Sequence, residues 1–156
     1  MLKHVVNLST KTSVYPFDAG MRQPNAVDLR VDRVYRLKPG TLGLDGDTKK
    51  PLKRVEILPE KLYWDLGPGY YVIEFAQQVV MGPQEAGIAV PRSTLMRNGV
   101  LIHSCLYDSG YRGSMVSGMT IADGVWFCFP KGERLAQFLV MDAEAVDQYR
   151  GSYQEA

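Results

Sequence analysis

The sequence has 156 residues, 46% of them hydrophobic, which fits a single globular domain spanning residues 1–156. Its 18 Lys and Arg residues almost balance its 17 Asp and Glu residues, so the overall charge argues against nucleic acid or an anionic membrane as a partner. The N-terminal segment MLKHVVNLST lacks the apolar stretch of a signal peptide, and no apolar run is long enough to cross a bilayer, so we expect a cytoplasmic protein. The two cysteines, Cys105 and Cys128, stand in apolar runs without a C-x-x-C motif, and we expect both to be buried free thiols.

In the first half of the chain, most segments have the pattern of β-strands. Lys3–Thr10 is short and rich in β-forming residues, and Val27–Leu37 alternates apolar and polar residues. A change of phase before Val34 indicates a β-bulge in the second of these segments. Lys38–Arg54 is rich in Gly, Lys, Asp and Pro, which predicts an exposed excursion, and its DGDTKK motif lacks the spacing of a calcium loop. Further strand patterns follow in RVEIL, KLYWDL and the long run Tyr70–Val80.

The second half of the chain continues this pattern with one exception. Ile88–Val90 is a short strand pattern after the turn sequence MGPQEAG. Val100–Tyr107 and Tyr111–Ile121 flank the tight turn DSG, which predicts a hairpin. VWFCF and RLAQFLVM are two further apolar strand patterns, joined by PKGE. Many short strands separated by turns predict an all-β barrel or jelly roll.

The exception is PRSTLMRNG, from Pro91 to Gly99, which predicts a short helix. Its residues do not alternate, and Leu, Met and Arg favour helices. Ser93 suits the N-cap of such a helix, and Gly99 suits a left-handed stop. Free N–H groups at the start of the helix, with Arg92 beside them, form a candidate phosphate site. On these residues alone, a capped surface helix with an incidental arginine is the preferred interpretation.

Two polar residues and the C-terminal segment each allow a structural and a functional interpretation. Asp108 opens the DSG turn, where aspartate usually caps backbone N–H groups, but a carboxylate at a hairpin tip beside an anion site can also act as a general base. Gln137 lies in an apolar strand, where its amide must bond either the backbone or a ligand. The segment 149–156 is either a frayed end or a cover for a ligand. His4 and His103 have no partners at the spacing of a metal site or a catalytic triad.

Five segments of the chain, taken together and in order, resemble the superfamily of trimeric dUTPases and dCTP deaminases. They are QPNAVDLRV, PRSTLMRNG, LYDSGYRG, GERLAQFLV and YRGSYQ, and they extend from Gln23 toward the end of the chain. Each segment alone is weak, but the ordered set is specific. The resemblance implies a distorted, mostly antiparallel β-barrel of jelly-roll type with one short helix, assembled as a homotrimer with its sites between subunits. It also implies a deoxyribonucleoside triphosphate as the ligand, either dUTP or dCTP, with Mg²⁺ as the cofactor.

The resemblance further implies roles for individual residues. Asp108 matches the aspartate that activates water for attack on the α-phosphorus, and Tyr111 matches the aromatic residue that packs on the deoxyribose and leaves no room for a 2′-hydroxyl. Asp28 matches an aspartate near the water shell of the metal, which phosphate oxygens mainly hold. The residues that match nucleoside-binding positions, where backbone groups read the base, are Ser104, Leu106, Tyr107 and Tyr111. The residues that match phosphate-binding positions are Arg92, Ser93, Arg97, Gln137, Tyr153 and Gln154.

One position bears on whether the chemistry is hydrolysis or deamination. In the deaminases of the superfamily, a glutamate in the strand after the turn aspartate moves protons to and from the cytosine ring. Here that position is Gly118, which has no titratable group. Two features point toward deamination. The pattern R-S-x-L-x-R, with Arg97 in its last position, is deaminase-like. The tail is deaminase-like as well, since the Gly-rich arm of many dUTPases is missing.

We therefore expect a dUTPase with a deaminase-like scaffold, which converts dUTP to dUMP and pyrophosphate. The alternatives left open are a dCTP deaminase, a bifunctional deaminase and dUTPase, and a diphosphatase that also accepts dCTP. A non-catalytic nucleotide-binding regulator is a further alternative from a different class.

Overall fold

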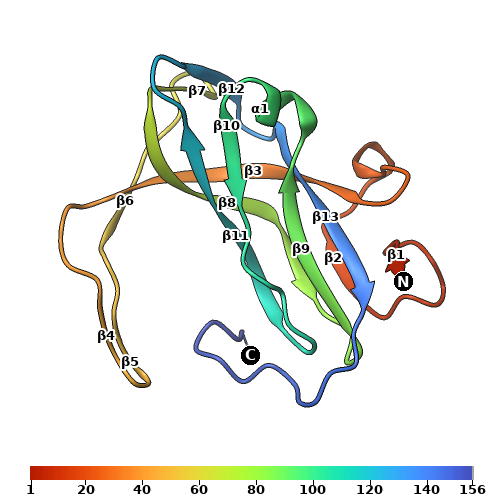
Figure 1. Cartoon of the computed structure of the whole chain (residues 1–156). Coiled ribbons are helices and arrows are strands. Elements are labelled where there is room, and N and C mark those ends of the chain that lie inside the picture. Colours follow the sequence, from red (N-terminus) through yellow and green to blue (C-terminus); the bar gives the residue numbers. More distant parts are fainter. Residues whose placement is uncertain (156) are drawn as a thin grey trace.

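The structure, a computed structural model, describes residues 1–155, and nearly all of its regular elements are strands (Figure 1). A five-residue α-helix and a single 3-10 turn interrupt them. The elements in chain order are β1 (Leu2–Lys3), β2 (Ser13–Tyr15), η1 (Ala19–Met21), β3 (Val27–Leu37), β4 (Gly43–Asp45), β5 (Thr48–Lys50), β6 (Arg54–Glu56), β7 (Tyr63–Leu66), β8 (Gly69–Val80), β9 (Glu85–Pro91), α1 (Ser93–Arg97), β10 (Val100–His103), β11 (Arg112–Ile121), β12 (Phe127–Pro130) and β13 (Arg134–Asp142).

One antiparallel sheet curls around the core as a half-barrel. Its strand order is β1-β13-β3-β8-β11-β10, with β2 paired to β8, β6 to β3 and β9 to β13. Two further two-stranded sheets, β12–β7 and the hairpin β4–β5, lie outside this sheet. Figure 1 shows the curl, since β3 runs across the view while β9, β11 and β13 run down it. The predicted all-β fold with one short helix is confirmed.

Strand β3 contains the predicted β-bulge. Its first half buries Val27, Leu29 and Val31 on the core face, and Asp28 between them is buried on the opposite face. The register against β8 then shifts between Val31 and Arg33, and the next buried pair is Val34 and Tyr35. One extra residue in a strand moves the following side chains to the other face, so the change of phase in the sequence has its physical cause here.

The core lies inside the curl and consists mainly of aliphatic and methionine side chains from β3, β8, β11 and β13. Its fully buried members include Leu29, Ile73, Met115, Met119 and Leu135. At 25 cal/mol per Å², burying each such side chain contributes about 1.5–3 kcal/mol. This packing fixes the strands whose ends carry the candidate site.

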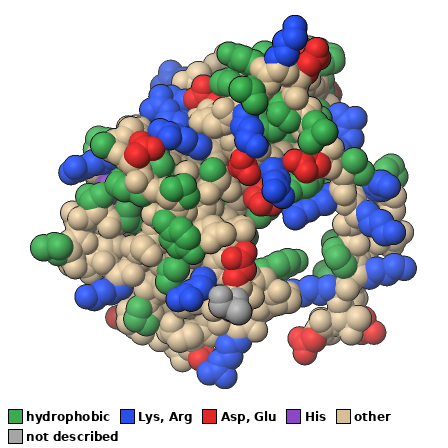
Figure 2. Space-filling model, turned by 180° about the vertical axis from the view of Figure 1, so that it is seen from behind, with side chains coloured by type: hydrophobic (Ala, Val, Ile, Leu, Met, Phe, Trp, Pro, Cys, Tyr) green, Lys and Arg blue, Asp and Glu red, His purple; other side chains and the backbone are tan. Residues whose placement is uncertain are grey.

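The residues 38–54, which follow β3 and end at the first residue of β6, form an arm that stands away from the body. Figure 2 shows the arm carrying several Lys and Arg side chains, with open space between it and the rest of the molecule. Every residue of β4 and β5 is exposed except Gly43, which is half-buried. The exposed excursion predicted for Lys38–Arg54 is confirmed.

Two expectations were wrong. Cys105 and Cys128 are both exposed free thiols. Cys128 lies in the two-stranded β12–β7 sheet, where alternate side chains point outward, and the buried neighbour is Phe129. Cys105 lies beyond the last paired residue of β10, where the chain leaves the ladder. The N-terminal strand is also shorter than Lys3–Thr10, because β1 contains only Leu2 and Lys3.

None of the helices within residues 1–155 has the length and apolar character needed to cross a membrane.

Candidate active site

Helix α1 begins directly after Arg92, at one end of β9. Arg92 is the N-cap residue, in extended conformation, and no side chain caps the helix, so Ser93 is the first helical residue rather than the predicted cap. Gly99 ends the segment with φ of +78°, a left-handed conformation that glycine adopts without a steric penalty, as predicted. The backbone N–H of Arg92 donates to Leu135 O at 3.2 Å, which ties the start of the helix to β13.

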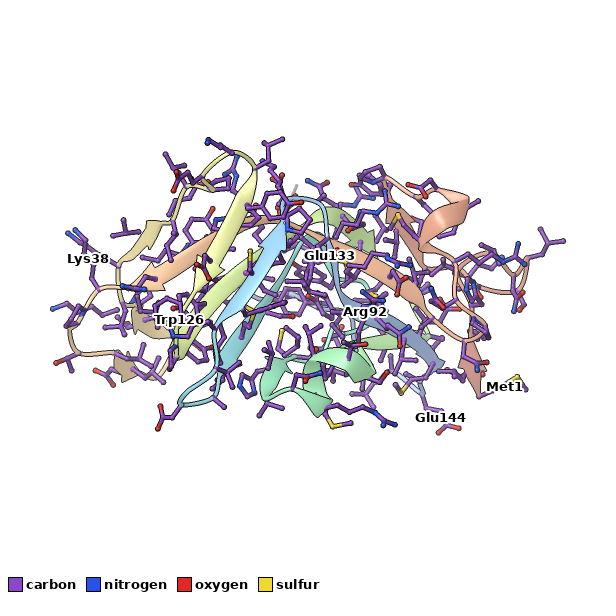
Figure 3. The ribbon with its side chains drawn as sticks, turned by 90° about the horizontal axis from the view of Figure 1, so that it is seen from above. Met1, Lys38, Arg92, Trp126, Glu133 and Glu144 are labelled. Atoms are coloured by element: carbon purple, nitrogen blue, oxygen red, sulfur yellow. The ribbon has the colours of Figure 1, made fainter. Side chains whose placement is uncertain are left out.

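The guanidinium of Arg92 is held by groups next to the start of β13. Its Nη1 donates to the backbone oxygen of Arg134 at 3.0 Å and lies 3.5 Å from Glu133 Oε1. Figure 3 labels Arg92 and Glu133, which belong to the start of α1 and to the loop before β13. The Arg92 side chain keeps 30% of its surface exposed. A second ligand therefore has access to a guanidinium whose position is already fixed.

An open pocket of about 440 Å³ lies beside this arginine. Its polar lining comes from Gln23, Arg92, Ser93, Thr94 and Gln137. The other lining residues are Val90, Pro91 and Met96. Arginine, hydroxyl and amide donors around one opening suit an anion such as a phosphate.

Asp28 lies buried behind the pocket, with 1% of its surface exposed. It pairs with Gln137 across β3 and β13, and its oxygens accept hydrogen bonds from Gln23 Nε2 at 2.8 Å, Arg134 Nη1 at 3.2 Å and Gln137 Nε2 at 3.4 Å. A buried carboxylate needs such partners, since an unpaired buried charge is costly. The structure thus brings together Asp28, Arg92, Ser93 and Gln137, and Asp28 fixes the amide that faces the pocket.

Arg97 lies at the other end of α1, is exposed, and is not among the residues that line this pocket.

Asp108 lies at the far end of β9, in the tight turn of the predicted hairpin. The turn closes with Tyr111 N donating to Asp108 O at 3.0 Å, and Gly110 adopts φ of +80°. The buried Ser109 Oγ donates to Glu85 O at 2.8 Å, which anchors the turn on the first residue of β9. The Asp108 carboxylate is exposed and accepts no hydrogen bond from any residue in the described range 1–155. It is therefore an unbonded carboxylate on an anchored turn.

The segment 104–107 leaves β11 and runs against β9, so β10 ends at His103 rather than at the predicted Tyr107. Tyr107 and Gly87 exchange backbone hydrogen bonds of 2.8 and 3.0 Å. The Ser104 hydroxyl accepts from Ala89 N at 2.9 Å and donates to Cys105 O at 2.6 Å. The side chain of Ser104 therefore shapes this segment, while Leu106 is exposed at its end.

Tyr107 and Tyr111 stay protonated at physiological pH. Burial raises the pKa of Tyr107 well above its ordinary value, and burial together with Glu155 and Tyr149 raises the pKa of Tyr111 to about 12. The Tyr111 hydroxyl donates to Ser114 O at 2.8 Å, which fixes the tilt of the ring. The neutral ring of Tyr111 is half-buried and can offer an apolar wall to a sugar.

The C-terminal tail folds back over this turn and passes below the β10–β11 hairpin in Figure 1. Gln154 Nε2 donates to Gly110 O at 3.1 Å, and Gln154 Oε1 accepts from Arg112 N at 3.0 Å. Tyr153 lies under Lys49 of the arm, with Nζ 5.1 Å from the ring centre. Of the two tail residues predicted for phosphate binding, Gln154 thus bonds the turn of Asp108, whereas Tyr153 contacts the arm.

The predicted residues therefore form two groups at opposite ends of β9. One group surrounds Arg92 and the other surrounds Asp108, and Figure 1 shows α1 and the β10–β11 turn at opposite ends of the molecule. Strand β9 has seven residues, so about 20 Å separates its ends. A single chain does not bring Asp108 to the pocket beside Arg92.

No group of three or more His, Cys, Asp or Glu side chains in the described part of the chain is arranged to hold a metal ion.

Comparison with known proteins identifies the family of this chain. The model of a family described as dCTP deaminase-like matches residues 2–143. The chain belongs to the dCTP deaminase-like family. A relative from Methanopyrus kandleri, named "Probable deoxyuridine 5'-triphosphate nucleotidohydrolase", is 34% identical over 137 residues, which cover 87% of this chain and 89% of the relative. A relative of the same name from Methanothermobacter thermautotrophicus is 33% identical over 144 residues, or 91% of this chain and 93% of that one.

Two solved structures are similar to this member of the dCTP deaminase-like family in fold alone. A 2'-deoxycytidine 5'-triphosphate deaminase from Agrobacterium tumefaciens has a TM-score of 0.64 at 18% identity, and the match covers 83% of this chain but only 43% of that one. A dUTPase from phage phi11 of S. aureus has a TM-score of 0.54 at 13% identity, over 93% of this chain and 99% of that one. The resemblance predicted from the five segments is confirmed.

Within this family scaffold, the side chain of Tyr70 lies directly over Gly118. It pairs with His103 in β10 and with Val72 in β8. A Cβ on Gly118 would meet the ring of Tyr70, whose Cζ lies 2.9 Å from the Cβ position. The Tyr70 ring stacks on His103 with 6.1 Å between ring centres. The position predicted for a deaminase glutamate is thus filled by an aromatic side chain from β8.

The sequence did not identify several residues that hold the site. Gln23 and Arg134 bond Asp28, Glu133 pairs with Arg92, and Tyr149 packs on Tyr111. Gln23 and the pair 133–134 lie inside the segments QPNAVDLRV and GERLAQFLV, so the sequence shows that they belong to segments of the site. Their bonding partners could not be recognised, because Arg134 reaches Asp28 across 106 residues of sequence, and Glu133 reaches Arg92 only where β13 pairs with β9.

Proposed function

We propose that this protein is a dUTPase that hydrolyses dUTP to dUMP and pyrophosphate in the cytoplasm. The observation that carries the choice is Gly118, where Tyr70 occupies the space that a proton-shuttling glutamate requires. Deamination needs an acid–base group at the cytosine ring, whereas hydrolysis needs a base near the α-phosphorus. Asp108 supplies such a base, and the names of the relatives from Methanopyrus and Methanothermobacter agree with hydrolysis.

The proposed mechanism uses the exposed carboxylate of Asp108 as general base. Asp108 takes a proton from a water molecule, the water oxygen forms a bond to the α-phosphorus, and the bond from that phosphorus to the bridging oxygen of pyrophosphate breaks. A carboxylate is ionised at neutral pH and therefore ready to accept the proton. Because Ser109 anchors the turn to Glu85, the Asp108 carboxylate keeps a fixed position relative to β9.

The nucleoside is proposed to bind along the segment 104–107 and against Tyr111. Backbone groups of Cys105 and Leu106 read the base edge, because those of Tyr107 already bond Gly87. The triphosphate is proposed to bind Arg92, Ser93 and Gln137 in the open pocket. Arg97, Tyr153 and Gln154 remain proposed phosphate contacts that a closed assembly would have to bring to the pocket.

We propose that Mg²⁺ enters with the triphosphate, whose oxygens hold most of its coordination sphere and whose charge it neutralises. Asp28 would act on the metal only through water. Its two oxygens already accept three hydrogen bonds from protein side chains, so they suit an indirect role better than direct ligation.

A complete site is proposed to need more than one copy of the chain, assembled as a homotrimer. The separation of about 20 Å along β9 supports this, since one copy would supply Asp108 and another the pocket of Arg92. Mixing an Asp108→Asn variant with an Arg92→Ala variant tests it, because subunit exchange rebuilds some intact sites. We expect two inactive samples to regain part of the wild-type activity. No recovery in a demonstrably mixed oligomer would exclude a shared site.

Product analysis tests the reaction itself. The protein is incubated with dUTP or dCTP and Mg²⁺, and pyrophosphate and ammonia are measured separately. We expect pyrophosphate from dUTP and no ammonia from dCTP. Ammonia would establish deamination, pyrophosphate from both nucleotides would make the enzyme a less selective diphosphatase, and binding without turnover would make the protein a regulator.

A further inference from the structure

Four aromatic rings form a continuous row from the core to the tail. The buried Phe138 packs on Tyr107 with 5.3 Å between ring centres, and Tyr107 packs on Tyr111 with 5.6 Å. Tyr149 from the tail completes the row against Tyr111 at 5.2 Å. The interplanar angles of 84°, 64° and 84° are edge-to-face, the arrangement that aromatic quadrupoles favour.

Tyr149 is the outermost ring of this row and is itself anchored to the turn. Its backbone N–H donates to Ser109 O at 2.8 Å. The neighbouring Gln148 lies directly over Gly110, whose added Cβ would come within 2.6 Å of Gln148 Oε1. Tyr149 lies beyond residues 2–143, which the family model matches, so this contact comes from the chain's own tail.

The two neighbours of Tyr111 differ in what holds them. Tyr107 is 4% exposed, and its hydroxyl donates to Val116 O at 3.2 Å, so the core fixes it. Tyr149 is only half-buried, and none of the described residues bonds its hydroxyl. The Tyr111 ring is therefore packed between Tyr107 of the core and the ring of Tyr149, while its hydroxyl is held by Ser114 O.

We propose that Tyr149 is a positioning residue that holds the Tyr111 ring in place and so sets the preference for 2′-deoxyribose over ribose. The inference rests on the proposed function, in which Tyr111 is the wall beside the sugar. The Tyr111 ring excludes a 2′-hydroxyl only if the ring cannot move by a fraction of an ångström. A ring that is free to shift makes room for the hydroxyl. Removing Tyr149 leaves Tyr111 without its outer neighbour and widens the sugar site.

The test compares kcat and KM for dUTP and UTP in wild type, Tyr149→Ala and Tyr149→Phe. An edge-to-face pair contributes an amount equivalent to about two- to tenfold in an equilibrium, so the ratio of kcat/KM for dUTP over UTP should fall by about that factor in Tyr149→Ala. The change should appear in KM more than in kcat, since Asp108 is untouched. Tyr149→Phe should keep the wild-type ratio, because the ring and not the hydroxyl makes the contact.

Val146→Ala is the matched control, because Val146 belongs to the same tail and is fully exposed. It should leave both substrates unaffected. An unchanged ratio in Tyr149→Ala, or an equal loss in Tyr149→Phe, would overturn the inference. If Tyr149→Ala does not fold, Tyr149→Leu replaces it, since leucine fills part of the space without an aromatic edge.

Failure of the proposed function is a separate result. A wild-type protein that does not hydrolyse dUTP would remove the dUTPase assignment whatever the variants do. Calorimetric titration with dUMP and UMP then tests Tyr149 without turnover. We expect the dUMP preference of the wild type to shrink by the same two- to tenfold factor in Tyr149→Ala. Equal preference in both proteins would overturn the role of Tyr149.

Discussion

A buried carboxylate, Glu85, supports the turn that carries Asp108, and its removal gives a quantitative test of the structure. Glu85 is 2% exposed at the start of β9. Its carboxylate accepts hydrogen bonds from Thr12 Oγ1 at 2.6 Å, Thr12 N at 2.8 Å and Lys11 N at 3.0 Å, and it pairs with Lys3 Nζ at 3.1 Å. Its backbone oxygen receives the Ser109 hydroxyl, so the same residue anchors the turn.

These partners also set the protonation of Glu85. Burial alone would raise its pKa, but the hydrogen bonds from Thr12, Lys11 and Lys3 outweigh burial and lower the pKa below its ordinary value. A folded-state pKa below the unfolded value means that ionised Glu85 stabilises the fold above the unfolded pKa of about 4.3. That contribution is lost as the pH falls through the lower folded-state pKa.

Glu85→Gln keeps the shape of the side chain and removes its charge. The new amide places two N–H donors among the donors of Thr12 and Lys11, so at least one buried group loses its partner. Lys3 keeps Asp142 at 2.8 Å, so the ammonium is not left alone. We expect a loss of about 3 kcal/mol in the free energy of unfolding at pH 7. For a chain of this size that corresponds to a fall of about 6–12 °C in Tm.

Thermal unfolding at pH 7 and at pH 3 measures this effect, with Glu144→Gln as control. Glu144 is exposed and lies in the same region, just after β13, as Figure 3 shows. We expect Glu144→Gln to match the wild type at both pH values. The gap between wild type and Glu85→Gln should be full at pH 7 and much smaller at pH 3. An equal gap at both pH values, or no gap at pH 7, would refute the role assigned to the charge.

Three further substitutions test other parts of the structure. Asp108→Asn should lower kcat by about 10²–10⁴ while nucleotide affinity, measured by calorimetry, stays within a few-fold, because only the base is lost; full turnover would remove Asp108 from the mechanism. Arg92→Lys should raise KM for dUTP about tenfold with little change in kcat, since lysine keeps the charge but lacks the fork that bonds Arg134 O and a phosphate together; steady-state kinetics decide this, and an unchanged KM contradicts the pocket assignment. Ser117→Ala should raise the free energy of unfolding by about 1 kcal/mol in chemical denaturation, because the Ser117 hydroxyl is a buried polar atom without a hydrogen-bond partner in the described chain; a loss of stability would show that an unseen partner holds it.

Much of the fold could be predicted from local patterns. The alternation in β3 and its change of phase follow directly from the period of two in a half-buried strand. The arm at residues 38–54 follows from its Gly, Lys and Asp content, and Gly99 from the left-handed stop of a helix. Each of these features depends on residues within a few positions of one another, so one sequence contains the necessary information.

The exposed cysteines show where local reasoning fails. An apolar run such as VWFCF predicts burial on both faces, but β12 pairs with a single strand and covers only one. The side on which Cys128 lies is decided by β7, more than sixty residues earlier in the chain. The same limit applies to Ser104, whose hydroxyl bends the chain toward β9 and ends β10 early. Tertiary pairing, not local preference, decides these positions.

The candidate site, too, could be predicted from the sequence only in part. The residue types and their order could be recognised, but the distance between Arg92 and Asp108 could not, because it depends on the length and direction of β9. The sequence also contains no signal that the tail would return to its own turn, since Gln154 and Tyr149 bond groups about forty residues earlier.

The pair Gly118 and Tyr70 lies apart from the residues of the proposed hydrolysis. On β8 and β11, Gly118 and Tyr70 lie on one face, because Tyr70 pairs with Thr120 and side chains two positions apart share a face. The Tyr70 ring is half-exposed, so a side chain at position 118 would require the ring to turn aside. Asp108 lies on the turn anchored by Ser109, and Arg92 lies at the start of α1, so neither depends on which residue stands at 118. The proposed hydrolysis therefore does not need the group that deamination needs, which is why the deaminase-like segments and a hydrolase function are compatible in one chain.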